Sequence, residues 1–404
     1  MMKKIFLYSF PGIALLASIF GCTTPYNYQN NDFEDVIIVE ATLTNEYKNH
    51  EVKISRTYSL EESFPQFESQ AIVNVTDDLG NKYDFAETGS SYISVDKFQA
   101  VPERQYQLHI VTKNGRTYVS GTEKLTTQTQ IGSVVPNVTT KNGIRGVQIE
   151  VNSSDPTSTS RYYRYKYDET YKVVAPIWFS QEAVPAGNVV TPSPRTTEAR
   201  TCYSDQKSNE IILTSTNDLS EDRVSNFPVK FISSKDHIIR NRYSILVKQY
   251  VQTLAAHTYY ETLKEISDNG SILSQTQPGF FRGNIKSVDD SREKVIGFFE
   301  VSSYSEKRIF FNFNDLFPKT PSPEYQYYCP IVIPEGEAAN FYFNNCYNTS
   351  PNSTCQGPTI VELIKTRARV FFPTDDSQKI ILYTIQCGDC TSFSSNIKPS
   401  FWID

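Results

Sequence analysis

Short alternating apolar runs, separated by turn signals, organise the first third of the chain. In "YQLHIVTKNGRTYVSG", alternate residues from Tyr106 to Ile110 fall on one face, and Asn114-Gly115 has the chemistry of a tight hairpin turn. The runs "VIIVEATL" and "AIVNVTDD" precede it with the same alternation. Strands that recur at about ten-residue spacing predict an all-β sandwich. We therefore expect residues 35–130 to form an immunoglobulin-like domain.

A second series of strand patterns begins near Ile131 and continues to "KIILYTIQC". One helix interrupts it in "TLAAHTYYETLKEISDNG", where Thr253 is a candidate N-cap and apolar residues recur at helical spacing, so we predict a helix near residues 253–268. Residues 176–201 have the composition of a long loop or an insertion. The fold class expected is mainly β, with a larger β-rich domain over residues 131–404 that carries this one α-helix.

The N-terminus, "MMKKIFLYSFPGIALLASIFGC", has two lysines, an apolar run and then Gly21 before Cys22, which is typical of an export signal. The run is short for a membrane span, which needs about 20 residues. "IFGC" resembles a bacterial lipobox, in which the peptide is cut before the cysteine and the thiol is acylated, for example with palmitate. We therefore expect a signal peptide at residues 1–21 and a lipid-anchored tether at residues 22–34; simple secretion is the alternative.

An acidic "NDFED" follows the tether's first residues and resembles the surface-export signals of Bacteroidota lipoproteins. It indicates a protein anchored to the outer membrane and displayed on the cell surface, with the periplasmic face as the alternative.

The chain has seven cysteines, and setting aside Cys22 leaves six that could form disulfides. These six are Cys202, Cys329, Cys346, Cys355, Cys387 and Cys390. An even count in an exported chain predicts three disulfides, but six cysteines allow 15 pairings. The turn-rich segment "CYNTSPNSTC" favours closure of Cys346 with Cys355.

The pair Cys387-x-x-Cys390 has a spacing shared by redox catalysts, zinc sites and disulfides. The residues after it, "TSFSSNIKPSFW", are too polar and Pro-broken for the helix of a thioredoxin-type motif, and no histidine or second C-x-x-C lies close in sequence to complete a zinc site. The disulfide interpretation is favoured. Whether the two cysteines pair with each other or elsewhere stays open.

The charge balance and the absence of known motifs exclude several classes of function. The chain has 39 basic and 45 acidic residues, a net charge of -6 and no long basic run, so no nucleic-acid partner is expected. None of the four histidines has zinc-motif spacing, and G-x-S-x-G, P-loop and G-x-G-x-x-G motifs are absent from the sequence, so we expect no metal and no cofactor. His109 is expected to point outward, and His257 to lie on the polar side of the helix beside Glu261.

Acidic pairs could in principle form the two carboxylates of a glycosidase. The candidates are Asp77-Asp78, Glu221-Asp222, Asp289-Asp290 and Asp375-Asp376. Each lies in a turn-like setting, where Asp is favoured for its local backbone hydrogen bonds, so we expect turn roles.

One strand alternates Tyr163, Tyr165 and Tyr167 with Arg164 and Lys166. Exposed tyrosines of this kind could stack on a sugar or anchor a protein, which makes them weak ligand-binding candidates. The alternative, which we favour, is that the three tyrosines pack on the core while the two basic residues face solvent.

Several stretches, taken in order, carry a family resemblance: the lipobox, "DVIIVEATLTNEYKNHEVKISRTYSL", "AIVNVTDDLGNKYDF", "YQLHIVTKNGRTYVSG", "ARTCYSDQKSNEIILTSTNDLSEDRV", "RYSILVKQYVQTLAAHTYYETLKE", "GNIKSVDDSREKVIGFFEVSSYSEKRIFF" and "CGDC...NIKPSFW". The chain resembles the Bacteroidota lipoproteins grouped as domain-of-unknown-function family 4249. Residues 324–356 fit the pattern least well. The family has no assigned activity, so only the lipobox cysteine, Cys22, carries over.

Members of that family are often encoded beside TonB-dependent outer-membrane transporters. The resemblance therefore implies a non-catalytic accessory lipoprotein that captures or gates a substrate for such a β-barrel transporter, rather than an enzyme. A structural or adhesive surface module is the alternative, and a hydrolase of unknown substrate is the third.

Overall fold

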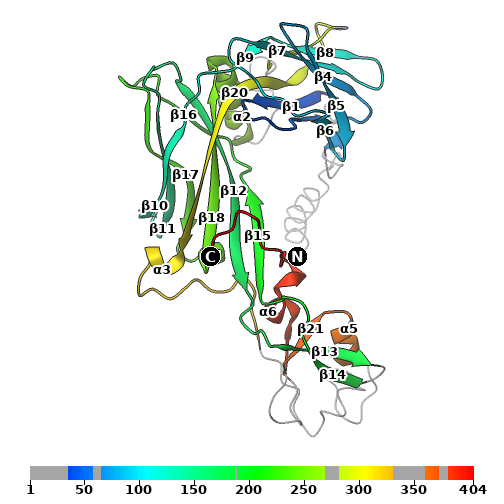
Figure 1. The fold of residues 1–404 in the computed structure, drawn as a ribbon, viewed down its shortest axis with the longest axis vertical. Helices are drawn as coiled ribbons and strands as arrows, with labels where there is room; N and C mark the ends of the chain where they lie inside the picture. The colour runs from blue at the N-terminus through cyan, green and yellow to red at the C-terminus, as the bar shows by residue number, and fades with distance from the viewer. Residues whose placement is uncertain (1–34, 58–64, 187–188, 269–281, 331–359, 373–380) are drawn as a thin grey trace, which may run out of the picture.

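The computed structural model describes residues 35–57, 65–186, 189–268, 282–330, 360–372 and 381–404. The fold is mainly β, as the strand patterns predict. Figure 1 shows three parts along the long axis: an N-terminal sandwich at the top, a second sandwich in the middle and a small subdomain at the bottom. The predicted signal peptide, Cys22 and the tether lie outside the described residues.

The N-terminal sandwich has immunoglobulin-like connectivity. Its main strands are β1 (Ile37–Thr44), β2 (Glu51–Arg56), β4 (Ile72–Asp77), β5 (Lys82–Thr88), β6 (Ser91–Ser94), β7 (Gln105–Val111) and β8 (Thr117–Ser120). The short strands β3 (Gln66–Phe67) and β9 (Glu123–Lys124) pair with β2 and β7. One layer runs β1-β2-β6 and the other β5-β4-β7-β8, and the β5–β6 hairpin crosses between them.

Alternating burial gives this sandwich its core, because successive side chains of a strand point to opposite faces. Tyr106, Leu108 and Ile110 of β7 are buried, as the sequence predicts. The hydroxyl of Tyr106, near the start of β7, accepts a hydrogen bond from the Val101 N–H at 3.0 Å. A tyrosine that reaches back in this way at the start of this strand is a hallmark of immunoglobulin-like sandwiches.

One long strand joins the two sandwiches. The first part of β20 (Val295–Asn312) pairs in parallel with β1, and the remainder pairs antiparallel with β18 (Arg242–Gln252). Just before it, β19 (Ile285–Ser287) pairs with β8. Both edges of the N-terminal sandwich are thus covered by strands from far along the chain, an exchange that the predicted division at residue 130 did not anticipate.

A close backbone crossing makes this exchange possible. A Cβ added at Gly283 would lie 1.6 Å from the carbonyl oxygen of Gly297 in β20, and one added at Gly297 would lie 2.5 Å from the Val39 carbonyl oxygen. Only glycine lets the two segments approach so closely. The chain can therefore reach β8 before it turns back along β1.

The second sandwich packs two sheets face to face. One sheet contains β15 (Thr201–Lys207), β12 (Tyr162–Val174), β18 and the second part of β20, with β16 (Ile212–Ser215) also on β12. The other contains β10 (Ile131–Lys141), β11 (Ile144–Ser154) and β17 (Arg223–Ser233). Buried residues of β11, β12 and β18 form the core between them.

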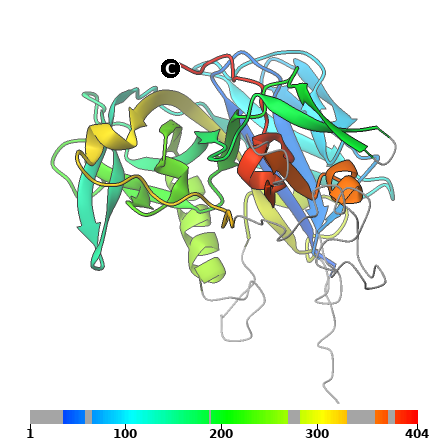
Figure 2. The same ribbon diagram turned by 90° about the horizontal axis from the view of Figure 1, so that it is seen from below.

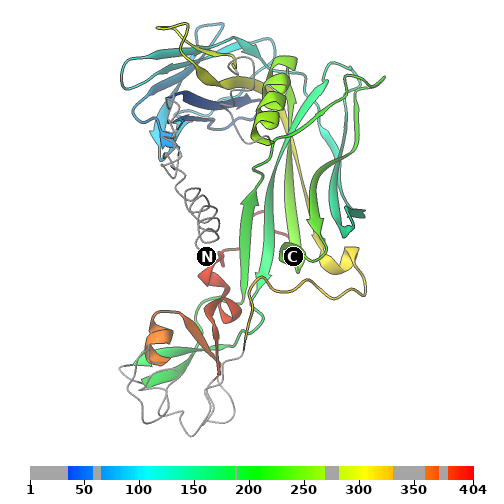
Figure 3. The same ribbon diagram turned by 180° about the vertical axis from the view of Figure 1, so that it is seen from behind.

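The predicted helix is α2 (Leu254–Asp268), and it lies across the outer side of the β12–β18–β20 sheet (Figure 3). Thr253 caps it, because its hydroxyl accepts a hydrogen bond from the Ala256 N–H at 3.2 Å. Tyr259 and Ile266 are buried on the packed side. The predicted stop at Asn269-Gly270 lies outside the described residues.

The small subdomain lies to one side of the second sandwich, away from β10 and β11 (Figures 1 and 2). Its elements are β13 (Gln181–Ala186), β14 (Val189–Pro194), β21 (Arg369–Phe372), β22 (Ile381–Thr384), α5 (Ile360–Lys365) and α6 (Ile385–Gly388). Of the two alternatives for residues 176–201, a loop is wrong, since β13 and β14 form a hairpin there, and an insertion agrees with the place of that hairpin in the small subdomain. The prolines that suggested a loop are tolerated because this two-stranded sheet consists only of edge strands.

Three further short elements complete the described chain: α3 (Phe313–Leu316), η1 (His237–Ile239) and η2 (Cys390–Ser392). The one predicted helix is thus the one long helix of the described residues. The C-terminal residues cross the outer face of the β15–β18–β20 sheet, where the Trp402 ring packs on Tyr203 and Phe310 at 5.0 and 5.6 Å.

Candidate functional site

The tyrosines of β12 point into the second sandwich. Tyr163 and Tyr165 are fully buried and Tyr167 is 4% exposed. Their hydroxyls are satisfied there: Tyr163 donates to Asp222 at 2.8 Å, Tyr165 donates to Gln249 at 3.0 Å, and the Tyr167 hydroxyl lies 3.2 Å from the Lys230 ammonium group. The core alternative is therefore the one observed. These rings offer no exposed surface for stacking a ligand.

The prediction that Arg164 and Lys166 both face solvent holds for only one of them. Lys166 is exposed as expected, but the Arg164 side chain is 3% exposed and forms an ion pair of 2.5 Å with Glu300 of β20. Its guanidinium lies between the rings of Tyr250 and Tyr260, 4.4 and 4.5 Å from their centroids. The prediction was wrong because α2 and β20 cover this outer face, which alternation along β12 alone does not reveal.

A buried polar network surrounds this pair where the two sandwiches meet. Glu300 also accepts hydrogen bonds from Gln252 at 3.0 Å and Ser302 at 2.6 Å. Burial by itself lowers the pKa of Arg164, but Glu300 and the neighbouring tyrosines raise it above its usual value. His257 is buried beside Gln252 rather than on the polar side of α2 as predicted, and burial lowers its pKa. The network thus holds the charged Arg164–Glu300 pair where the two sandwiches meet, a region that we call the joint.

An open groove of about 1120 Å³ runs along the side of the second sandwich. We call it the edge groove and define it by two runs of lining residues, 209–213 from the β16 side and 227–231 from β17. Successive side chains of a strand alternate between faces, so a cavity that meets consecutive residues approaches the strand at its edge. The β17 wall of the edge groove is therefore a strand edge, and the other wall consists of residues 209–211, which lead into β16, and the first two residues of β16.

Polar groups of the core reach this groove from below. Lys230 of β17 contacts Glu169 at 3.1 Å, and the Tyr243 hydroxyl donates to the same carboxylate at 2.5 Å. Burial lowers the pKa of Lys230, but Glu169 and Tyr167 more than offset this, so the ammonium stays charged. The charge of Glu169, which is 2% exposed, is thereby compensated and the groove floor is electrically balanced.

Two aromatic rings form a fixed wall. Phe227 stacks on Tyr165 with centroids 5.5 Å apart. Phe231 lies over Gly146 of β11, where an added Cβ would lie 2.6 Å from its ring. Glycine at this position gives the Phe231 ring its place, so the apolar wall does not depend on flexible side chains.

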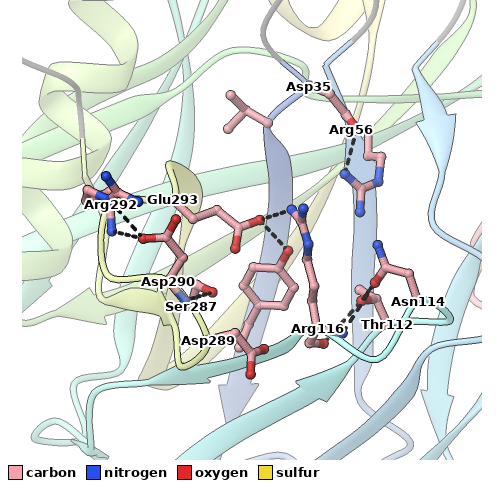
Figure 4. Close-up of polar contacts among 12 residues, drawn as sticks. Asp35, Arg56, Thr112, Asn114, Arg116, Ser287, Asp289, Asp290, Arg292 and Glu293 are labelled. Atoms are coloured by element: carbon pink, nitrogen blue, oxygen red, sulfur yellow. Dashed lines mark hydrogen bonds and ion pairs between the residues drawn. The ribbon is translucent and has the colours of Figure 1, made fainter.

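A second polar cluster lies at the free end of the N-terminal sandwich, where the described chain begins at Asp35 (Figure 4). Glu293 accepts hydrogen bonds from Arg116 at 2.8 Å and from Tyr118 at 2.7 Å, beside a hollow of about 390 Å³. Burial raises the pKa of Glu293, but hydrogen bonds from Ser287, Tyr118 and Arg116 bring it below its usual value. This carboxylate stays ionised and paired.

Asp77 and Asp290 have the turn roles that the sequence predicts for the acidic pairs, and Asp290 accepts a hydrogen bond from the Arg292 N–H at 2.9 Å. Asp289 does not, because it accepts its hydrogen bond from the Thr117 N–H of β8, at 2.6 Å and 172 residues away along the chain. Asp77 accepts from the Leu79 N–H at 3.0 Å. Asp222 differs, because it is buried and holds Tyr163 in the second core. Asp375-Asp376 lies outside the described residues.

Two disulfides resolve the pairing question for four cysteines. Cys202 of β15 bonds to Cys390, and Cys329 bonds to Cys387. The C-x-x-C pair is thus disulfide-bonded as favoured, with each cysteine paired elsewhere, and it fastens the C-terminal segment to the second sandwich. Cys346 and Cys355 lie outside the described residues, so their predicted pairing stays a prediction.

Within the described ranges, no cluster of three or more His, Cys, Asp or Glu side chains has the arrangement of a metal site. The same ranges hold no helix long and apolar enough to cross a bilayer.

Sequence reasoning missed the edge groove and the Arg164–Glu300 pair. A signal for the pair exists, since Glu300 interrupts the apolar run "VIGFFEV" of a strand that is otherwise buried. A buried carboxylate such as that of Glu300 needs a cationic partner, and Arg164, which alternates with core tyrosines along its strand, is a candidate for that partner. The groove has no comparable signal, because it depends on which strands meet across the two sheets.

Comparisons with known proteins agree with the family resemblance. The chain belongs to the family described as Domain of unknown function (DUF4249), which matches residues 23–308. The match includes Cys202 but ends before Cys329, Cys387 and Cys390, so the "CGDC" ending is not part of it. A search of curated proteins finds no match.

Among solved structures, trypsin-activated alpha-2-macroglobulin from Escherichia coli matches at 5% identity over 55% of this chain and 15% of its own, with a TM-score of 0.17. Lamprey immune protein matches at 8% identity over 69% of this chain and 97% of its own, with a TM-score of 0.06. At these TM-scores neither likeness carries an argument about fold or function.

Proposed function

We propose that this chain is a Bacteroidota lipoprotein of the outer membrane, displayed on the cell surface and acting as a non-catalytic binding partner of a TonB-dependent transporter. In this role it captures or gates a substrate. The export signal, the lipobox cysteine Cys22 and the family membership support the location.

The observation that carries the binding role is the rigid connection between the tethered sandwich and the groove-bearing one. The continuous β20 strand hydrogen-bonds to both sheets, and the Arg164–Glu300 pair closes the joint. A tether of residues 22–34 can extend to at most about 45 Å. An occupant of the edge groove would therefore stay within a limited distance of the lipid anchor.

The proposal is tested by capture from solubilised outer membranes with the full-length, affinity-tagged chain. We expect a β-barrel transporter to co-purify. A matched Cys22→Ala variant, assayed by detergent phase partition, should move from the detergent phase to the aqueous phase. Recovery of the lipidated chain without any β-barrel partner would contradict the transporter proposal, and aqueous partitioning of the unchanged chain would contradict the anchor.

A structural or adhesive surface module is the second candidate, and exposed apolar side chains favour it. Tyr47 and Val95 are 69% and 61% exposed on neighbouring loops of the N-terminal sandwich, joined by the Asn49 amide, which donates to the Ser94 carbonyl at 2.7 Å. Deletion of the gene distinguishes the candidates: loss of attachment with normal nutrient uptake supports this one, and loss of uptake supports the transporter partner.

A further inference from the structure

The edge groove has the dimensions of a polymer site. Its volume of about 1120 Å³ exceeds the roughly 300–1,000 Å³ of small-molecule pockets, and it is open to solvent. A small ligand in such a groove would leave much of its surface in water. A chain molecule that lies lengthwise would fill it.

The two strand edges differ in what they can bind. β17 is interrupted by Pro228, which lacks an N–H, and by register shifts between Ile149 and Glu150 and between Val151 and Ser153 in its partner strand. Prolines and bulges blunt an edge against further pairing. β16 has no such interruption and pairs only with β12 in the described residues. Main-chain pairing is therefore available on the β16 wall.

The side chains around β16 set the pattern of the occupant. A strand added there would send alternate side chains inward, toward Phe227 and the buried Val229, and outward, toward the α2 side that carries Lys264. Lys141 lies on the β10–β11 side of the same groove. Both lysines are exposed, and neither has an ion-pair partner among the described residues, whereas Glu210 is the one exposed carboxylate in the lining.

We propose that the edge groove binds an extended acidic peptide segment of a partner protein by strand addition to β16, with apolar side chains inward and acidic ones toward Lys141 and Lys264. Main-chain hydrogen bonds would supply affinity and the alternating side chains specificity. The inference rests on the proposed binding function, since it names the chemistry of the partner segment. It needs no membrane component, so its test is separate from the capture experiment.

The test is selection of a phage-displayed random dodecapeptide library against the full-length mature chain. We expect enriched peptides that are acidic and alternate with apolar residues. Measured by fluorescence anisotropy, their Kd should rise at least about tenfold for Lys141→Glu/Lys264→Glu. Their Kd for the unchanged chain should also rise with added salt, because salt screens the lysine–carboxylate attraction. The matched control, Lys97→Glu/Lys113→Glu, reverses two exposed lysines of the other sandwich and should leave Kd unchanged.

Two further readouts keep the proposal falsifiable. N-methylation of alternate backbone amides in a selected peptide should abolish binding in one register and spare it in the other, as strand pairing requires. The proposal is overturned if no acidic peptide is enriched, if selected peptides bind the Lys141→Glu/Lys264→Glu variant as tightly, or if both methylated registers bind equally. It is also overturned if light scattering shows a dimer whose formation this variant abolishes, because a second copy then fills the groove.

Discussion

The two sandwiches handle their edges and interiors differently. In the N-terminal sandwich, β19 and β20 cover both outer edges, and the aliphatic and aromatic core lies beside a few buried polar side chains such as His50. The second sandwich leaves the edges of β16 and β17 open to a groove, and its core holds tyrosine hydroxyls bound to carboxylate and amide groups. One unit is closed on itself, while the other offers an unpaired edge.

The difference has a physical cost that suggests where binding takes place. Buried polar groups destabilise a core unless each finds a partner, and exposed strand edges invite unwanted pairing. Both sandwiches bury polar groups, such as His50 in the first and Glu169 in the second, but only the second leaves strand edges open to a groove. A closed sandwich next to the predicted tether and an open one beyond it is the arrangement expected of a spacer and a binding unit.

The largest effect is expected at the joint between the units. Arg164→Met leaves Glu300 buried without its cation, which should lower the free energy of unfolding by about 3–5 kcal/mol. The double variant Arg164→Met/Glu300→Leu removes both charges and should recover most of that loss. Urea unfolding followed by circular dichroism measures each variant.

The matched control is an exposed pair. Arg223 and Glu221 lie 3.2 Å apart with side chains 64% and 70% exposed, so Arg223→Met should cost less than about 1 kcal/mol. Two results would show that the joint does not depend on the pair. One is a loss of unfolding free energy for Arg164→Met as small as that of this control. The other is a double variant that is no more stable than Arg164→Met alone.

The stability of the closed, N-terminal sandwich should depend on pH through His50. Burial lowers the pKa of His50 to about 4, and its Nε2 lies 2.9 Å from the Phe98 carbonyl oxygen. The unfolded chain, with a histidine pKa near 6.5, binds more protons between these values, so stability present above pH 6.5 is lost as the pH falls toward 4. At pH 5 the expected loss is about 2 kcal/mol.

His50→Gln isolates this contribution, since glutamine can donate to the same carbonyl without titrating. The difference in unfolding free energy between pH 7.5 and pH 5.0 should shrink by about 2 kcal/mol in this variant. An unchanged difference would show that His50 is not held neutral in the fold.

The hydrogen bond from the Val101 N–H to the Tyr106 hydroxyl, which we call the Tyr106 corner, should contribute less to the free energy of unfolding. Tyr106→Phe leaves the Val101 N–H without its acceptor, which should cost about 1–2 kcal/mol in urea unfolding. Tyr83→Phe is the control, because its hydroxyl lies 3.5 Å from Asp77 and should cost under about 0.5 kcal/mol. Equal costs for both would remove the corner as a specific support of the closed sandwich.

The smallest stability effect is expected at the groove. Lys141→Glu/Lys264→Glu changes two exposed side chains that have no ion-pair partner among the described residues, so the free energy of unfolding should stay within about 0.5 kcal/mol. A loss of several kcal/mol would mean that these lysines support the fold, and that a binding defect in this variant has no specific meaning.

The comparison also explains how far sequence reasoning reached. Local patterns predicted the alternation around Tyr106, the Thr253 cap and the core position of the β12 tyrosines, because each depends on neighbours in the chain. The position of Arg164 depends on α2 and on Glu300, 136 residues away, and no periodicity along β12 encodes that contact. The edge groove depends on the spacing between two sheets, so local sequence could not predict it.

We propose that the open edge of the second sandwich, and not the closed N-terminal sandwich, binds the partner. Hydrogen exchange by mass spectrometry, on the chain alone and bound to its captured membrane partner, tests it most directly. Slower exchange at residues 209–213, with no change at residues 112–116 and 288–294 of the free end, is the result we predict. Protection confined to that free end, with residues 209–213 unchanged, would contradict the account.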